Sequence, residues 1–495
     1  MLERSASPTP LLAVARSSFS EESPDPSPRT INTTIIKHAH RKPSPSLKLV
    51  LMFTIAALVL VSVLQFSAVM GGVDAVRRKS SSSPSAACLG FSPKASPGVV
   101  VAERTYYPAN TTVVISNDYL GFGSASLPAF CRLQLLITTN ATAGSFAYTE
   151  VWLPDKTAWN QRMLTIGGGG VSGRADVAAL IAGVSTNGGH NSSAYDGTWG
   201  GPHNDARPTF SSTKNAIVDF AWRAVHLSVL AGKDIIQQSH QQAPKRSYYQ
   251  GCSTGGRQGL KETQLFPTSF DGIVIGSPAN WMRLVAWGAH LSKLIGPATA
   301  SHFIPAATWT GVIAPEVMKQ CDALDGVTDN VINDPSVCNF RPETLACSPG
   351  QDPATCLNAD QIAIIPQIYA YYYEDGKFVF TGLNYGGEDV YSTFLLGETP
   401  NTLITNWVQY MLLNDTTWTV DQYNSSVYKI GDATNPGHTD AINPDLSAFA
   451  ARPHNSNHPD GVAPTKILAT KFNNDVAADG VAFTRPLCKV RPLIR

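Results

Sequence analysis

The fold expected for this chain is decided by the stretch Tyr248-Tyr-Gln-Gly-Cys-Ser-Thr-Gly-Gly-Arg257. It contains a Gly-x-Ser-x-Gly motif, which presents a nucleophilic serine on a sharp turn between a strand and a helix. Residues 245–249 are typical of a short strand, and residues 257–264 include good helix formers. The flanking glycines suit a turn in which backbone segments pass too close for a Cβ atom. The pattern therefore predicts Ser253 as a nucleophile, and an ordinary glycine-rich turn is the alternative.

Length and charge limit the classes of protein to consider. The chain has 495 residues, enough for one large domain with an insertion or for two domains. Hydrophobic residues make up 43%, and Lys plus Arg equal Asp plus Glu at 37 each. Because the charges balance, the sequence indicates no nucleic-acid partner.

The first 73 residues differ in composition from the rest. Residues 1–46 are rich in Ser, Pro, Thr and Arg, which predicts a disordered tail. Residues 47–73 are strongly apolar, follow basic residues and are long enough, or nearly so, to span a bilayer. Two interpretations remain open: a transmembrane signal-anchor, or a cleaved signal peptide that begins at Met52. Both predict a protein that is secreted or membrane-anchored, with the later residues on the luminal or extracellular side.

Two further features agree with a secretory compartment. Five Asn-x-Ser/Thr sequons, which are potential N-glycosylation sites, follow the apolar segment at Asn110, Asn140, Asn191, Asn414 and Asn424. All eight cysteines also follow it, and most cysteines are paired in an oxidising compartment. None of them has the Cys-x-x-Cys spacing of a zinc site, so zinc is not expected.

Hydrophobic patterns predict an α/β core that is interrupted by an insertion. Strand-like runs alternate with a helix-like segment, at residues 133–138, 147–153, 163–166, 215–237 and 273–275. This alternation favours an open, mostly parallel sheet. We therefore assign residues 86–279 to the first part of the core. From residue 280 to 439 the composition changes, and cysteines, prolines and aromatic residues become frequent. This change indicates an inserted lid domain before the C-terminal segment 440–495.

Several longer runs are specific enough to indicate a family. They are Phe220-Ala-Trp-Arg-Ala-Val-His226, Gly251-Cys-Ser-Thr-Gly-Gly-Arg-Gln258, Phe270-Asp-Gly-Ile-Val274, Cys321-Asp-Ala-Leu-Asp-Gly-Val327, Asn443-Pro-Asp-Leu-Ser-Ala-Phe449 and Val481-Ala-Phe-Thr-Arg-Pro-Leu-Cys488. With these runs the chain resembles the tannase and feruloyl esterase family of α/β-hydrolases, over roughly residues 86–450 and 458–488. The cysteine directly before the nucleophile is the family's special mark.

The resemblance implies a reaction and the residues that perform it. It implies hydrolysis of small esters of aromatic acids, of the feruloyl or galloyl type, through an acyl-serine intermediate on Ser253. The backbone N–H of Thr254 and one N–H from the glycine run 167–170, for which we take Gly169, would form the oxyanion hole. Each such donor is worth about 3 kcal/mol in the transition state. A flexible turn that binds no ligand is the alternative for the glycine run.

The resemblance also implies a structural calcium ion in the lid. The ligands would be the side chains of Asp322, Asp325 and Asp329 and the backbone carbonyls of Val327 and Val331. Hard oxygen donors suit Ca²⁺. The spacing is not that of an EF-hand, and an acidic surface turn is the alternative.

Family-like disulfides account for six cysteines. The implied pairs are Cys88–Cys131, Cys321–Cys338 and Cys347–Cys356. Cys252 and Cys488 are left without their usual family partners. They could pair with each other, which the sequence alone does not decide.

One part of the family pattern is missing. In α/β-hydrolases the acid and the histidine follow the serine. In this family they lie in a His-Gly-x-x-Asp motif and a Gly-His-Cys motif, and neither occurs after Ser253. Instead, residues 444–452 run directly into the loop-like segment 453–464. The C-terminal part of the core is therefore expected to be incomplete, without the acid, the base and at least one strand.

The loss predicts an inactive esterase. His454 and His458, with Asp445 or Asp460 to orient them, are the nearest candidates for a substitute base. A loop seldom places a base within hydrogen-bonding reach of a nucleophile by accident. The alternative function is a non-catalytic, membrane-tethered protein that still binds aromatic esters.

Overall fold

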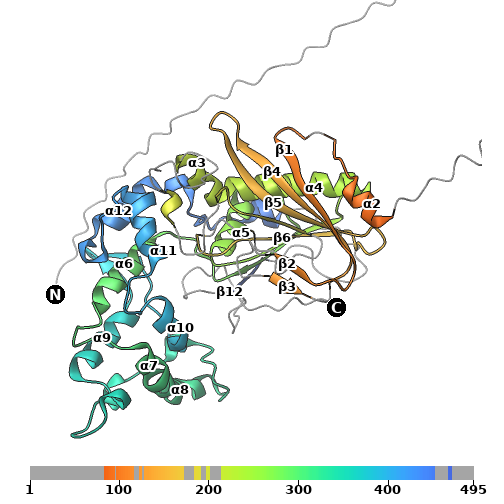
Figure 1. Ribbon diagram of the computed structural model, residues 1–495. Coiled ribbons are helices and arrows are strands. Elements are labelled where there is room, and N and C mark those ends of the chain that lie inside the picture. The colour runs from red at the N-terminus through yellow and green to blue at the C-terminus, as the bar shows by residue number, and fades with distance from the viewer. Residues whose placement is uncertain are drawn as a thin grey trace, which may run out of the picture. The chain divides into compact units, whose positions relative to one another are not determined.

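The computed structural model describes most of the chain after residue 82 (Figure 1). The described residues are 83–94, 96–115, 122–124, 127–171, 175, 183–190, 197–200, 213–451 and 467–470. All of them belong to a compact unit that extends from Ser82 to Arg495. The predicted tail 1–46 and the apolar segment 47–73 lie outside the described residues. Within the described ranges, no helix is long and apolar enough to cross a membrane.

An eight-stranded sheet organises the core of the described residues, in the order β1-β4-β5-β7-β6-β8-β9-β12 (Figure 1). Its strands are β1 (Val99–Tyr107), β4 (Phe130–Asn140), β5 (Ser145–Pro154), β6 (Arg162–Ile166), β7 (Gly183–Thr186), β8 (Arg246–Cys252), β9 (Gly272–Gly276) and β12 (Ile467–Thr470). The half formed by β7, β6, β8, β9 and β12 is parallel, as predicted. The half formed by β1, β4, β5 and β7 is antiparallel, which corrects the expected mostly parallel sheet.

Local sequence explains the antiparallel half. Only a short turn joins β4 to β5, and parallel neighbours would need a crossover of a dozen or more residues. Along β4, Leu133, Leu135 and Ile137 are buried while the residues between them are partly exposed. The period-two pattern thus predicted a half-buried strand correctly.

Helices pack against the parallel half. The predicted helix 215–237 is found as three consecutive pieces: α3 (Thr213–Val218), a π-helical segment (Asp219–Arg223) and α4 (Ala224–His240). Helix α4 packs on β7, and α5 (Thr254–Leu265) packs on β8 and β9. Leu230 is 49% exposed, because the helical repeat places it away from the buried face of α4.

The C-terminal sequence contributes to the same sheet. Strand β12 pairs in parallel with β9, from Ile467 opposite Ile273 to Thr470 opposite Gly276. Helix α13 (Ser447–Ala450) places Phe449 in the apolar cluster under the sheet. The expected truncated segment therefore still extends the sheet by one strand beyond β9.

A second apolar cluster occupies the predicted lid region. The helices there are α6 (Arg283–Ile295), α7 (Ala306–Thr308), α8 (Ala314–Cys321), α9 (Ala359–Tyr369), α10 (Glu388–Phe394), α11 (Thr402–Asn406) and α12 (Ser426–Thr434). Short two-stranded sheets are formed by β10 (Tyr372–Glu374) with β11 (Lys377–Phe380), and by β2 (Val113–Ile115) with β3 (Phe122–Ser124) near the core. Trp287, Trp309 and Trp407 are buried in this cluster, which also includes Phe220 from the π-helical segment. The exact limits 280–439 stay a prediction.

Disulfides tie down the described residues as expected. Cys88–Cys131 joins α2 (Pro84–Leu89) to β4, and Cys321–Cys338 and Cys347–Cys356 lie in the lid. Cys252 is disulfide-bonded too, a possibility that the sequence left open. Cys488 lies outside the described residues.

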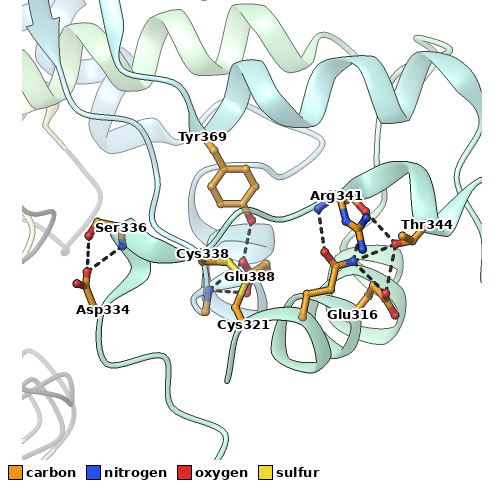
Figure 2. Close-up of a disulfide and its surroundings, with 11 residues drawn as sticks. Glu316, Cys321, Asp334, Ser336, Cys338, Arg341, Thr344, Tyr369 and Glu388 are labelled. Atoms are coloured by element: carbon orange, nitrogen blue, oxygen red, sulfur yellow. Dashed lines mark hydrogen bonds between the residues drawn. A yellow bond between two sulfur atoms is a disulfide. The ribbon is translucent and has the colours of Figure 1, made fainter. Parts of the chain in front are cut away.

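Figure 2 shows the lid around the Cys321–Cys338 bridge. The Tyr369 hydroxyl donates a hydrogen bond to the buried Glu388 carboxylate (2.8 Å), and the Gly386 N–H donates to the same carboxylate. Burial raises the pKa of Glu388, and these hydrogen bonds oppose that rise. The bridge closes the loop between the two cysteines.

The sequons differ in how accessible they are. Asn110, Asn414 and Asn424 are exposed. Asn140 is half-buried and donates to Asn215 (3.1 Å), so its amide is already used. Asn191 lies outside the described residues. Glycosylation stays a prediction.

Candidate active site

Ser253 lies at the predicted turn between β8 and α5. Its φ of 55° and ψ of −117° belong to a region that non-glycine residues seldom occupy, at a cost of about 1–3 kcal/mol. A Cβ on Gly251 would lie 2.4 Å from the carbonyl oxygen of Gly255. A Cβ on Gly255 would lie 2.8 Å from the carbonyl oxygen of Gly168. The glycines of the motif are therefore required by close backbone contacts.

Backbone hydrogen bonds fix the position of this serine and leave its side chain exposed. The Ser253 N–H donates to the Gly276 carbonyl (3.0 Å) at the end of β9. Its own carbonyl accepts from the N–H groups of Arg257 (3.0 Å) and Ala279 (3.0 Å). Ser253 is exposed, and its hydroxyl forms no hydrogen bond with any described residue. The hydroxyl is thus presented without a base among those residues.

The glycine run lies directly beside the turn. The Thr254 hydroxyl donates to the Gly170 carbonyl (2.6 Å), and the Gly168 N–H donates to the Gln258 side chain (3.1 Å). Gly170 lines the cavity beside Ser253, whereas Gly169 does not. The run is therefore pinned to the start of α5, and the choice of Gly169 as the second oxyanion donor stays a prediction.

An apolar cavity opens at Ser253. It is lined by Gly170, Val171, Phe220, Ser253, Thr254, Arg257, Ser277, Ala279, Met282, Leu284, Val285, Phe394, Leu395, Leu403, Ile404 and Trp407. Most of these are aliphatic or aromatic and come from the core turn and the lid together. An apolar lining of this kind suits a small aromatic molecule.

Candidate bases are absent from this cavity as far as the structure describes it. No histidine, aspartate or glutamate is among its lining residues. His290 instead stacks on Tyr372 in the lid, with ring centroids 3.8 Å apart. Asp445 accepts the N–H of Ser447 at the surface (2.9 Å). His454, His458 and Asp460 lie outside the described residues.

Sequence reasoning missed one charged residue of the cavity, Arg257. It lies four residues after Ser253, so the helical repeat places both on the same side of α5, which could have indicated it. Arg257 is 1% exposed, and its guanidinium donates to the carbonyls of Ala221 (2.8 Å) and Phe220 (3.4 Å). Burial lowers its pKa to about 10, so it stays protonated at neutral pH.

The acidic loop in the lid uses its carboxylates to close on itself. The Asp322 carboxylate is buried and accepts the N–H groups of Asp329, Asn330 and Val331. The Asp325 carboxylate accepts the N–H groups of Val327 and Asn333. No three acidic, histidine or cysteine side chains converge as a metal-ligand group within the described ranges. The carboxylate oxygens of this loop are suitable ligands for calcium. To bind the ion, they would have to give up these hydrogen bonds from backbone N–H groups.

The sheet, the turn and the cavity define the class as an α/β-hydrolase with a serine-esterase type of site. Comparison with known proteins makes the class narrower. The family described as tannase and feruloyl esterase matches residues 136–454. The chain belongs to this family of serine carboxylic ester hydrolases.

Individual relatives agree with this membership. A probable feruloyl esterase B-2 of Aspergillus flavus is 34% identical over 373 residues, which are 74% of this chain and 70% of the relative. Feruloyl esterase B of Aspergillus niger is 34% identical over 331 residues, which are 65% of this chain and 60% of that protein. The chain thus spans less than three quarters of the length of either relative.

Solved structures are similar as well. Feruloyl esterase B from Aspergillus oryzae superimposes with a TM-score of 0.68 and 30% identity, over 78% of this chain and 74% of that one. The tannin acyl hydrolase from Aspergillus niger, at 19% identity and a TM-score of 0.57 over 76% of this chain and 70% of that one, shares the fold.

Proposed function

We propose that the site is built to hydrolyse carboxylic esters of aromatic acids through an acyl-serine on Ser253. The observation that carries this proposal is the exposed, backbone-strained Ser253 at the mouth of an apolar cavity. The Ser253 Oγ attacks the ester carbonyl and forms the C–O bond of a tetrahedral intermediate. The Thr254 N–H, with Gly169 or its neighbour Gly170, donates to the resulting oxyanion. As the intermediate collapses, the ester C–O bond breaks, the leaving oxygen takes up the proton that Ser253 lost, and the alcohol departs with the aromatic acyl group left on Ser253. Attack of water on this acyl-serine then releases the acid and restores the hydroxyl.

The cavity lining favours a feruloyl group over a galloyl group. A galloyl ring carries three phenolic hydroxyls, and burying a hydroxyl without a partner costs about 1–3 kcal/mol. The walls are mainly aliphatic and aromatic, from Leu284, Leu395, Ile404 and Trp407 among others. A ring with a methoxy group and one hydroxyl leaves fewer polar groups unsatisfied. The relatives above are also named feruloyl esterases.

We propose that this chain has little or no esterase turnover. Two observations support this: the Ser253 hydroxyl has no base among the described residues, and no Gly-His-Cys motif follows it in the sequence. A serine site that loses its base keeps only a small fraction of its activity, supplied by the oxyanion hole and by binding.

A burst assay with a chromogenic feruloyl ester tests both halves of the proposal. We expect no burst from the purified chain, and Ser253→Ala gives the baseline. A version that regains an acid and a Gly-His-Cys segment after Ala451 is expected to acylate and turn over. Robust turnover by the unmodified chain, lost in the His458→Ala variant, would overturn the proposed inactivity. Failure of the restored version to modify Ser253, read by mass spectrometry, would overturn the esterase assignment.

The second candidate function is a binding protein without turnover, tethered to a membrane if residues 47–73 are not cleaved. The complete apolar cavity without a described base favours it. It requires a folded product that binds an aromatic ester and leaves it intact. Only unfolded protein, or a soluble product that has lost residues 47–73, would count against it.

We also propose that the acidic loop binds a structural Ca²⁺, since Asp322, Asp325 and Asp329 place three carboxylates on one short loop. Addition of calcium to the chelated protein should raise the melting temperature. Asp325→Asn, which removes one charge at an exposed ligand, should weaken that rise. A melting temperature that is unchanged by calcium would reject the site.

A further inference from the structure

Arg257 differs from the other well-buried arginines of the described chain in what it is bonded to. Arg132 pairs with Glu150 and Arg223 pairs with Asp219 (2.6 Å). Arg257 is more deeply buried than either, yet no described carboxylate forms an ion pair with it. Its partners are two backbone carbonyls and the face of Phe220, whose ring centre is 4.7 Å from the guanidinium carbon.

The two carbonyls belong to the π-helical segment Asp219–Arg223, where the wider turn makes carbonyls available to an outside donor. They account for two of the five N–H donors that a guanidinium carries. The carboxylate that acts on Arg257 electrostatically is Asp440, but an Asp440 oxygen accepts the N–H of Met282 (2.7 Å) instead. A buried cation that no described carboxylate contacts directly is costly, so the site favours an anion that reaches it.

The position of Arg257 is the second part of the argument. It lines the cavity together with Ser253, Thr254 and Phe220. Ser253 and Thr254 form the N-terminus of the twelve-residue helix α5, whose N-cap makes no side-chain hydrogen bond. A helix N-terminus also stabilises negative charge. Most of the remaining lining residues are apolar, so the cavity combines a cation that suits a carboxylate with walls that suit an aromatic ring.

We propose that this cavity binds free aromatic carboxylic acids, with the carboxylate at Arg257 and the ring between the lid and Phe220, and that it binds them more tightly than neutral esters or amides. The inference rests on the proposed acyl-binding role of the cavity. In a chain that turns over, it means that the acid product is retained and inhibits. In a chain without a base, it makes the free acid the preferred ligand.

Calorimetric titration of the full chain with ferulic acid and with its primary amide tests this directly. The amide has the same shape, carries no charge and resists hydrolysis. A charge-assisted hydrogen bond is worth about 1.5–3 kcal/mol, so the acid should bind about tenfold more tightly or better. Equal affinities in the unmodified protein would overturn the inference without any variant.

Substitutions of Arg257 test whether it is the cation that binds the carboxylate. Arg257→Met should remove the preference for the acid, while Arg257→Lys should keep part of that preference. Arg283→Met is the matched control, since Arg283 pairs with Asp432 and does not line this cavity. A preference that persists in a folded Arg257→Met protein would contradict the assignment.

Two outcomes separate this inference from the proposed function. If acid and amide bind equally, the cavity still binds the acyl group and only the role of Arg257 fails. If neither ligand binds, while Ser253 is acylated in the restored version, the acyl group lies elsewhere and both the cavity assignment and this inference fail.

Discussion

The turn at Ser253 and the loop at Asp322 are both short, and the sequence marks both as functional, yet they are held in opposite ways. At Ser253 the backbone makes the hydrogen bonds, to Gly276 and Ala279, and the side chain stays exposed. At Asp322 the side chain makes the hydrogen bonds, to three backbone N–H groups, and is buried. A residue whose backbone is held by others has a side chain available for chemistry, whereas Asp322 stabilises its own loop.

The largest effect that would sharpen this comparison is expected at Gly251. In Gly251→Ala the new Cβ meets the backbone of Gly255 at 2.4 Å, which a side-chain rotation cannot relieve. Overpacking of this kind costs about 3 kcal/mol of unfolding free energy, which urea denaturation measures. Gly311→Ala is the control, because a Cβ there meets nothing within 4 Å and should leave stability nearly unchanged. Equal stability of the two variants would show that the turn has room to relax.

A smaller loss is expected in the acidic loop. In chelated protein, Asp322→Asn replaces one acceptor oxygen by an NH₂ group that faces backbone donors, at a cost of about 2 kcal/mol. Asp325→Asn is the matched comparison on the same loop, and its loss should be smaller because that side chain is exposed. Thermal melts in EDTA measure the stability of both variants. If Asp322→Asn costs nothing without calcium, the side chain does not close the loop.

The smallest predicted effect is a gain in stability instead of a loss. Ser253→Gly removes a non-glycine residue from a φ of 55° and should gain about 1 kcal/mol of stability. Ser253→Ala also lacks the hydroxyl but keeps the backbone strain, so its stability should match that of the unmodified chain. A gain that appears in both variants would trace the cost to the hydroxyl instead of the backbone.

Much of the core near the site was predictable. The turn at Ser253 follows from glycines within four residues of it, because a close backbone contact between sequence neighbours is a local property. The strands β4 and β5 were readable from their alternation. The three described disulfides were predicted through the family resemblance and are confirmed.

Other features depend on residues that are distant in the sequence. The antiparallel half of the sheet was missed because periodicity does not state which strands are neighbours. Strand β12 was missed because its pairing with β9 joins segments almost 200 residues apart. The bonded state of Cys252 likewise could not be read from spacing.

By itself, then, the sequence indicated the family, predicted Ser253 as the nucleophile and identified the glycines that shape its turn, since these depend on local backbone geometry and on specific residue runs. Only the tertiary structure decided that the lid and the core close one apolar cavity over Ser253, and that Arg257 lines it with carbonyls for partners. The physical reason is that burial and charge pairing depend on which distant segments meet, and the π-helical carbonyls that meet Arg257 lie 36 residues or more before it.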